Sequence, residues 1–143
     1  MNIIKVKKLS NTAIIPTRQT TNSAGYDLYA NEDVTIVSHG FAAVGTGISV
    51  EMPNNIEGQV RPRSGLAFKH GITVLNSPGT IDADYRGEIR VCLINHGEYD
   101  YAIHAGDRIA QIVFAAVAPT ELMEVAQLGE TERGEGGFGS TGK

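Results

Sequence analysis

The sequence predicts an all-β fold, and three observations support this. Apolar and polar residues alternate over short β-branched segments, residues that form turns separate these segments, and helical periodicity is almost absent. Many short strands at this spacing are typical of a sandwich, a jelly roll or a small barrel. The length of 143 residues suits one compact domain.

The expected strands follow one another along most of the chain. The first, residues 3–9, alternates apolar and basic side chains, and the later ones are short and rich in β-branched residues. These later strands are expected at residues 34–37, 48–50, 59–61, 72–75, 88–95 and 108–115. Between them lie turn-forming runs, such as Pro-Asn-Asn at 53–55 and Ser-Pro-Gly at 77–79.

Only residues 64–70 show the pattern of a helix, and this helix would be barely two turns long. Ser64 is expected to cap it, which would leave backbone N–H groups of the first turn free to meet an anion. Arg61 and Arg63 precede the helix, and arginine fits phosphate oxygens better than lysine does. An ordinary capped turn is the alternative interpretation.

The composition changes at Thr131. Residues 131–143 contain five glycines and one large apolar side chain, Phe138, so this segment cannot fold alone. We therefore expect a β domain at residues 1–130 and a flexible arm at residues 131–143. A frayed terminus is the alternative, but Phe138 between glycines would place a stacking surface on a backbone that can wrap around a ligand.

Charge and hydropathy exclude some function classes. The formal net charge is −4 and no basic face is legible, which argues against binding long nucleic acid. No apolar stretch approaches the roughly 20 residues that cross a bilayer, and the first residues lack a signal peptide's apolar stretch. We therefore expect a cytoplasmic protein without a membrane partner. A small polyanion could still bind, because a few arginines and a magnesium ion neutralise it locally.

The single cysteine, Cys92, lies in an apolar run and has no partner within the chain. Free cysteines of this kind are usually small buried residues, so we expect neither a nucleophile nor a zinc ligand here.

Two carboxylates stand close together at Asp82 and Asp84. In a strand they would point to the same face, where one could act as a base or metal ligand while the other takes an arginine. A solvated turn is the plain alternative for an Asp-x-Asp pair. Asn76 before the pair, and Tyr85 and Arg86 after it, favour a hairpin used in recognition.

Two other polar side chains lie among apolar neighbours. Gln111 should share a strand face with Ile109 and Val113, where a buried amide must find hydrogen-bond partners. Neighbouring backbone could supply those partners. Asp27 likewise follows a glycine and is flanked by apolar residues. Each feature is weak when it is taken singly.

Taken together, five segments resemble the five ordered motifs of the trimeric dUTPase family. They are residues 24–28 (AGYDL), 63–67 (RSGLA), 76–88, 106–111 (GDRIAQ) and 133–142. The resemblance runs from about residue 5 to the carboxyl end, and five motifs in the same order are very specific.

The resemblance implies an all-β jelly roll that assembles as a homotrimer with shared active sites. One chain would supply the segments around Asp27, Ser64 and Gln111, a second chain the hairpin around Asp82, and a third chain its terminal arm. The family hydrolyses dUTP to dUMP and pyrophosphate by attack of water on the α-phosphorus. This reaction keeps uracil out of DNA and supplies dUMP for thymidylate synthesis.

The same resemblance assigns roles to the hairpin. Asp82 would orient and deprotonate the attacking water, as a general base must. Asn76 and the hairpin backbone, with Gly79 and Ile81, would read the uracil edge. Tyr85 would pack against the deoxyribose and leave no room for a 2′-hydroxyl group.

The phosphates would be held by the second and fourth motifs. The resemblance assigns this role to Arg63, Ser64, Gly65 and Gln111. Asp27 would reach a magnesium ion (Mg²⁺) through water, in keeping with the reluctance of that ion to dehydrate.

The arm would complete the site. Phe138 would stack on uracil, Arg133, Ser140 and Thr141 would meet the γ-phosphate, and Gly139 belongs to the same substrate-binding set. Outside this set, an ion pair between Asp84 and Arg86 is favoured over a direct role in catalysis.

Two alternatives remain open. The dCTP deaminase family shares the fold, but its late strand carries a catalytic glutamate where this chain has Gln111, and its second motif reads Arg-Ser-Ser. A non-catalytic regulatory binding module would be expected to have lost part of the constellation, yet Asp82, Gln111, Arg133 and Phe138 are all present.

Overall fold

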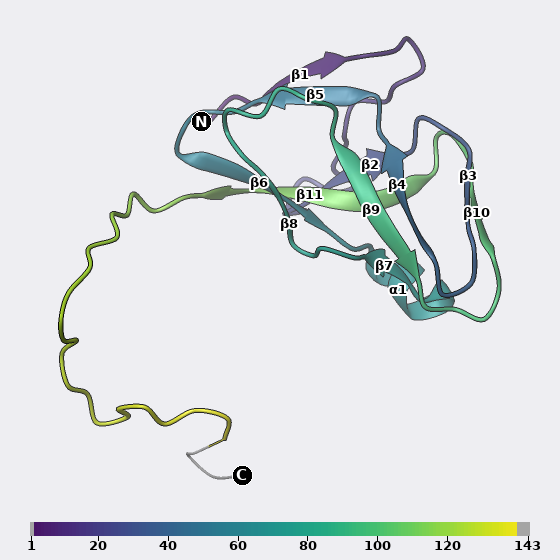
Figure 1. Ribbon diagram of the computed structural model, residues 1–143. Coiled ribbons are helices and arrows are strands. Elements are labelled where there is room, and N and C mark those ends of the chain that lie inside the picture. The colour runs from purple at the N-terminus through teal and green to yellow at the C-terminus, as the bar shows by residue number, and fades with distance from the viewer. Residues whose placement is uncertain (1, 140–143) are drawn as a thin grey trace.

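The structure is a computed structural model that describes residues 2–139, and it is built almost entirely of strands (Figure 1). Eleven strands and one helix occur in this range. In chain order they are β1 (Lys5–Lys8), β2 (Tyr26–Tyr29), β3 (Val34–Ile36), β4 (Phe41–Gly45), β5 (Ile48–Glu51), β6 (Ile56–Arg61), α1 (Ser64–His70), β7 (Ile72–Val74), β8 (Gly79–Ile81), β9 (Arg90–Asn95), β10 (Tyr101–Ile103) and β11 (Arg108–Ala116). The expected all-β fold with one short helix is confirmed.

Every strand expected from the sequence pattern is present, with ends that shift by a few residues. Four further strands, β2, β4, β8 and β10, are not evident from the pattern. Each of them spans five residues or fewer, and each lacks the run of three β-branched residues that marks equally short strands such as β3 and β7.

Strand pairing is antiparallel in all the sheets of the described chain. The largest sheet has the order β2-β11-β6-β8, a second has the order β4-β9-β7, and two smaller sheets pair β1 with β5 and β3 with β10. All four sheets contribute to one buried core, with Leu28, Ile36, Ile48 and Leu93 at most 1% exposed. Burial of each such side chain stabilises the fold by about 1.5–3 kcal/mol.

Helix α1 begins at Ser64, one residue earlier than it would if Ser64 were its N-cap. Arg63 occupies the N-cap position with an extended backbone and makes no side-chain capping bond. The expectation that Ser64 caps the helix is therefore wrong, because Ser64 is itself the first helical residue. The helix ends at Gly71, whose φ of 68° is left-handed and whose N–H donates to the carbonyls of Leu66 and Ala67.

After β11 the chain leaves the β body and runs away from it as an extended segment (Figure 1). Residues 117–139 contain no helix or strand. Their large apolar side chains are exposed, including Leu122, Met123, Leu128 and Phe138. Within residues 2–139, no helix is long and apolar enough to span a membrane. Cys92 is a free thiol, and it is half-buried in β9 rather than fully buried.

Candidate functional site

The four-stranded sheet has one apolar face and one polar face. Residues paired across an antiparallel ladder lie on the same face. Ile112 pairs with Val60, and both are buried in the core. Gln111, the next residue along β11, pairs with Asp27 on β2 and with Arg61 on β6. Asp27, Gln111 and Arg61 therefore form a polar row across three strands on the outer face of the sheet.

Asp27 is held by two arginines. Its side chain is only 14% exposed, and its Oδ2 accepts a hydrogen bond from Nη1 of Arg108 at 3.1 Å. Nε of Arg63 lies 3.9 Å from Oδ1. Asp27, Arg63 and Arg108 together form the Asp27 cluster, which carries a net charge of +1. Arginines in this arrangement suit the binding of phosphate oxygens.

The two arginines also contact each other through the backbone. Nη1 of Arg63 donates to the carbonyl oxygen of Arg108 at 2.6 Å. Both arginines line a hollow of about 230 Å³ that also includes Leu66 and Tyr101. Burial raises the pKa of the Tyr101 phenol above its ordinary value, and the nearby carboxylate of Asp107 adds to the increase. The Tyr101 phenol is uncharged at neutral pH, and Asp107, which also lines the hollow, adds a carboxylate to it.

The Gln111 side chain is fixed at the edge of this cluster. Its Nε2 donates to the carbonyl of Pro62 at 2.9 Å, which confirms that neighbouring backbone satisfies the amide. Gly25 leaves room for the Gln111 side chain. A Cβ at position 25 would overlap Oε1 of Gln111 and would lie 3.3 Å from the Cβ of Gln111. Ile109 does not share this half-buried environment, since it is 2% exposed and belongs to the core. The expected common face of Ile109 and Gln111 is therefore wrong, and a register shift between Arg108 and Ala110 is the reason.

The start of α1 follows directly from Arg63. Ser64 and Gly65 are both exposed there. A Cβ placed on Gly65 would meet nothing within 4 Å, so the backbone at this position is open to a ligand. The structure thus brings Asp27, Arg63, Gln111 and the first turn of α1 to one region of the surface.

The hairpin residues lie elsewhere on the same sheet. Asp82 immediately follows β8, and its carbonyl accepts a bond from the N–H of Tyr85 at 3.1 Å, which closes a turn. Asp82 and Asp84 are both exposed. Within one chain they therefore lie in a solvated turn and not on the face of a strand. Strand β8 is at the opposite edge of the sheet from β2. Three strand spacings place Asp82 about 14 Å or more from Asp27.

The side chains around the turn are held by backbone atoms. The Tyr85 hydroxyl donates to the carbonyl of Glu88 at 3.0 Å. Nη1 of Arg86 donates to the carbonyls of Ala83 and Tyr85 at 2.7 and 3.1 Å. Because these carbonyls take the guanidinium group, the expected ion pair between Arg86 and Asp84 is absent from the ion pairs of residues 2–139.

Asn76, Gly79 and Ile81 complete the hairpin. Asn76 is exposed, and its Nδ2 would lie 3.3 Å from a Cβ at position 79. Gly79 is buried and Ile81 is half-buried. The side chain of Asn76 therefore lies beside the backbone of Gly79, and a larger residue there would crowd it.

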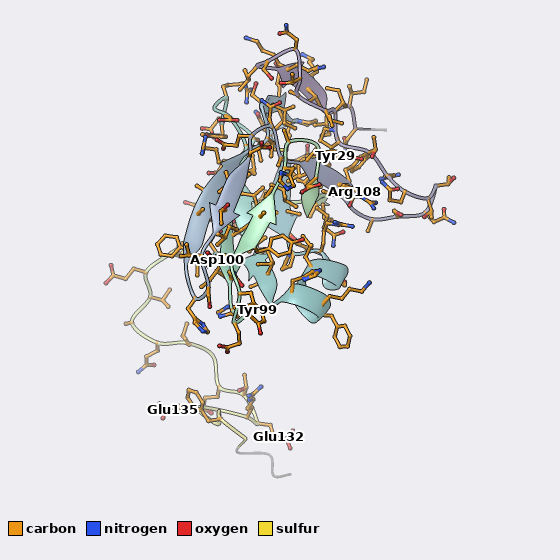
Figure 2. The ribbon with its side chains drawn as sticks, turned by 90° about the vertical axis from the view of Figure 1, so that its right-hand side faces the viewer. Tyr29, Tyr99, Asp100, Arg108, Glu132 and Glu135 are labelled. Atoms are coloured by element: carbon orange, nitrogen blue, oxygen red, sulfur yellow. The ribbon has the colours of Figure 1, made fainter. Side chains whose placement is uncertain are left out.

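The arm residues are far from both groups. Figure 2 shows Glu132 and Glu135 well away from Arg108 and Tyr29, in agreement with Figure 1. Nε of Arg133 donates to the carbonyl of Gly136 at 2.7 Å, and Phe138 is fully exposed. Gly139 has a φ of 85°. The candidates Ser140 and Thr141 lie outside the described residues.

The side chains of the described residues suit a magnesium ion that is bound through water rather than by direct ligands. Among residues 2–139, no group of three or more His, Cys, Asp or Glu side chains could hold a metal ion. Among residues 2–139, Asp27 is the one carboxylate that pairs with Arg63 and Arg108, and both its oxygens face these arginines. Magnesium keeps several of its waters and commonly takes phosphate oxygens as ligands. A single carboxylate reaching it through water is consistent with that chemistry.

A comparison with known proteins identifies relatives along nearly the whole chain. The model of the dUTPase family matches residues 11–142. The deoxyuridine 5′-triphosphate nucleotidohydrolase of Nautilia profundicola is 56% identical over 140 residues, which are 98% of this chain and 99% of that protein. The protein of the same name from Helicobacter hepaticus is 55% identical over 97% of this chain and 88% of its own length.

Solved structures show the same fold. A mutant dUTPase of Staphylococcus bacteriophage 80alpha with bound dUpNHpp has a TM-score of 0.93 at 30% identity, over the full length of both chains. A mutant dUTPase from phage phi11 of S. aureus, described with a structural Mg(II) ion, has a TM-score of 0.83 at 25% identity and covers 90% of this chain and 100% of that one. The jelly-roll-like architecture and the short helix are common to this group.

Proposed function

We infer that this chain, which belongs to the dUTPase family, is a dUTP diphosphatase that hydrolyses dUTP to dUMP and pyrophosphate. One observation carries this inference. The family match at residues 11–142 spans all five motif segments, and the relatives named as nucleotidohydrolases align over nearly their whole length.

The phosphate chain of dUTP binds at the outer face of the four-stranded sheet. Arg63, Ser64, Gly65 and Gln111 hold it, and the net positive charge around Asp27 supports this role. The open backbone at Gly65 lets phosphate oxygens approach the first N–H groups of α1. The Gln111 amide keeps its orientation through the bond to Pro62.

Asp82 acts as the general base of the reaction. It accepts a proton from the water that attacks the α-phosphorus, and the pyrophosphate group leaves from that phosphorus. An exposed carboxylate next to a closed turn supports this role, because the side chain can meet a water molecule directly. Among residues 2–139, Asp82 has no ion-pair partner that would compete.

The hairpin also selects the nucleoside. Asn76 and the backbone at Gly79 and Ile81 read the uracil edge, and Tyr85 packs against the deoxyribose. The Asn76 side chain beside the backbone of Gly79 and the anchored hydroxyl of Tyr85 support a hairpin that is ordered before the nucleoside binds. Cytosine reverses the donor and acceptor groups on the edge that is read, and such mismatches discriminate by about 10⁴-fold. The methyl group of thymine would clash with the hairpin.

Asp27 would hold Mg²⁺ through water, together with oxygens of the bound triphosphate. The bound ion supplies charge neutralisation to the phosphate oxygens. Asp27 suits this role because it is a half-buried carboxylate with a fixed orientation. The relative from phage phi11 was described with a structural Mg(II) ion, which supports a magnesium-binding family without fixing where the ion binds in this chain.

The active form is a homotrimer in which each site uses residues of all three chains. Asp82 and Asp27 lie at opposite edges of one sheet, so one chain does not bring them together. Exposed apolar side chains on the segment after β11, among them Leu122, Met123 and Leu128, need a partner surface to be shielded from water. Both observations support assembly.

The arm from a third chain closes over the bound nucleotide. Phe138 stacks on uracil, while Arg133, Ser140 and Thr141 meet the γ-phosphate and Gly139 allows a close approach. The full exposure of Phe138 and the absence of hydrogen bonds between residues 118–139 and residues 2–116 support an arm that is free to bind elsewhere. We place the enzyme in the cytoplasm, where this reaction removes dUTP before uracil enters DNA and supplies dUMP for thymidylate synthesis. Neither nucleic acid nor a membrane is a partner.

A panel of deoxynucleotides tests the proposed function. The full-length protein is incubated with Mg²⁺ and with dUTP, dTTP or dCTP, and release of pyrophosphate and of ammonia is measured together. We expect pyrophosphate from dUTP, with rates at least about 10²-fold lower for dTTP and dCTP. Ammonia from dCTP would favour the deaminase alternative, equal turnover of all three would refute uracil reading, and no turnover at all would favour a binding module.

A further inference from the structure

Strand β11 contains an irregularity next to the phosphate cluster. Gln111 pairs with Asp27, and Arg108 pairs with Tyr29. Three positions separate the residues on β11 but only two separate those on β2, so β11 carries one extra residue, and the register shifts between Arg108 and Ala110. Figure 2 shows Arg108 and Tyr29 close together at this end of the sheet.

The extra residue decides where the Arg108 side chain points. Side chains alternate along a strand, so three positions would normally turn Arg108 to the face opposite Gln111. The bulge cancels this half-turn, and Arg108 joins Asp27 and Gln111 on the outer face. Bulges of this kind re-aim side chains and are common beside active sites.

Arg108 then makes two different contacts within the cluster. Its guanidinium Nη1 donates to Oδ2 of Asp27 at 3.1 Å. Its backbone carbonyl accepts from Nη1 of Arg63 at 2.6 Å. Nε of Arg63 is farther from Asp27, at 3.9 Å. Arg108 is therefore the closer cation of Asp27, and it also fixes the direction of the other arginine.

We propose that Arg108 is a positioning residue of the triphosphate site: by pairing with Asp27 it keeps that carboxylate from drawing Arg63 away from the phosphates. This inference rests on the proposed function and deepens it. Without the Arg108 guanidinium, Asp27 has Arg63 as its nearest cation and forms a closer pair with it. Arg63 then offers fewer hydrogen-bond donors to a phosphate oxygen.

The test measures ligand binding by Arg108→Met, which keeps most of the side-chain length and removes the charge. Dissociation constants for a non-hydrolysable dUTP analogue and for dUMP are measured at saturating Mg²⁺ by calorimetry. We expect the analogue to bind about 10-fold to 100-fold more weakly, the range for a lost charge-assisted hydrogen bond, while dUMP binding changes by less than about twofold. An equal loss for both ligands, or no loss for either, would overturn the inference.

A double-mutant cycle separates positioning from direct contact with phosphate. If Arg108 acts through Asp27, Arg108→Met should weaken analogue binding by less than about twofold in an Asp27→Asn background, because no carboxylate remains to draw Arg63. Additive effects would mean that Arg108 touches the phosphates itself, and would overturn the positioning role. Arg108→Lys should restore part of the affinity, since lysine keeps the charge but not the planar fork.

Arg90→Met is the matched control. Arg90 has a similar exposure, 48% against 40% for Arg108, and it also pairs with carboxylates, those of Glu32 and Glu88. Its substitution should leave analogue binding unchanged. Failure of the wild-type chain to bind the analogue would count against the proposed function itself. Tight wild-type binding with an unaffected Arg108→Met variant would overturn only this inference.

Discussion

The Asp27 cluster and the Asp82 hairpin belong to the same four-stranded sheet. Within a single chain, however, the carboxylate of Asp27 is paired and that of Asp82 is exposed. Asp27 is 14% exposed and pairs with Arg63 and Arg108. Asp82 is exposed, and among residues 2–139 its backbone carbonyl accepts a bond from Tyr85 while its side chain has no ion-pair partner. One chain thus completes the pairing of Asp27 by itself, whereas the Asp82 side chain faces solvent, as the proposed sharing of the site between chains requires.

Physical chemistry explains why the two carboxylates differ. A carboxylate removed from water must be paired, or its ionised form becomes very costly. Asp27 therefore needs its arginines within the same chain before assembly. An exposed carboxylate such as Asp82 is stabilised by water and needs no partner.

Asp82→Asn should have the largest effect on the hairpin half. We expect kcat for dUTP to fall by about 10³-fold, the range for loss of a general base, while the dissociation constant for a non-hydrolysable analogue stays within a few-fold. Steady-state pyrophosphate release and calorimetry measure the two quantities. Asp84→Asn is the matched control, and a similar loss there would mean that the chemistry is not specific to Asp82.

Removal of residues 131–143 should lower kcat/KM for dUTP by about 10²-fold, because closure excludes water and adds phosphate contacts. Both halves on the sheet should stay folded, so the melting temperature and the oligomeric mass should not change. Thermal denaturation and light scattering check this. Loss of the oligomer would show that these residues hold the chains together instead.

Gly25→Ala should damage the Asp27 half through packing alone. The added Cβ overlaps the Gln111 amide, which must leave the carbonyl of Pro62. We expect about 10-fold weaker binding of a dUTP analogue and a loss of about 1 kcal/mol in the free energy of unfolding. Gly129→Ala, whose Cβ meets nothing within 4 Å, is the control and should change neither. Unchanged analogue binding by Gly25→Ala would mean that the orientation of Gln111 does not matter.

The smallest effect concerns Tyr101 at the back of the cluster. Burial and Asp107 raise its pKa above 10.0 in the folded state. Between the unfolded and folded pKa values the folded chain binds more protons, so stability due to this group is present below about pH 10 and falls as the pH rises further. Tyr101→Phe should therefore lose less stability between pH 9 and 11 than the wild type, as measured by urea unfolding. Parallel curves would contradict the assigned shift.

Much of the fold can be predicted from the sequence, because apolar and polar residues alternate along strands that have one buried face. Strand β11 is long enough for this, whereas β8 and β10 span three residues each and carry no readable period. Asp27 and Gln111 stand out as polar residues among apolar ones. Asp82, Tyr85 and Phe138 also stand out locally, but only the ordered motifs give each of them a specific role.

Other parts of the site depend on geometry that alternation does not predict. Arg108 reaches Asp27 only because of the register shift in β11. Ser64 looks like a helix cap, but the helix starts one residue earlier than a Ser64 cap requires. Arg86 looks like a partner for Asp84, but backbone carbonyls of its own turn compete for its guanidinium. In each case a local backbone detail overrides the side-chain pattern.

In the proposed homotrimer the two halves of each site come from different chains, and mixing of variant subunits tests this arrangement. One chain carries Asp82→Asn, and the other carries Ser64→Ala together with Gln111→Ala, so that each is nearly inactive alone. Co-expressed in equal amounts, they should recover about a quarter of wild-type activity, because random pairing leaves that share of sites with both halves intact. Activity no higher than that of the separate variants would mean that each site is built within one chain, and would contradict the sharing of sites between chains.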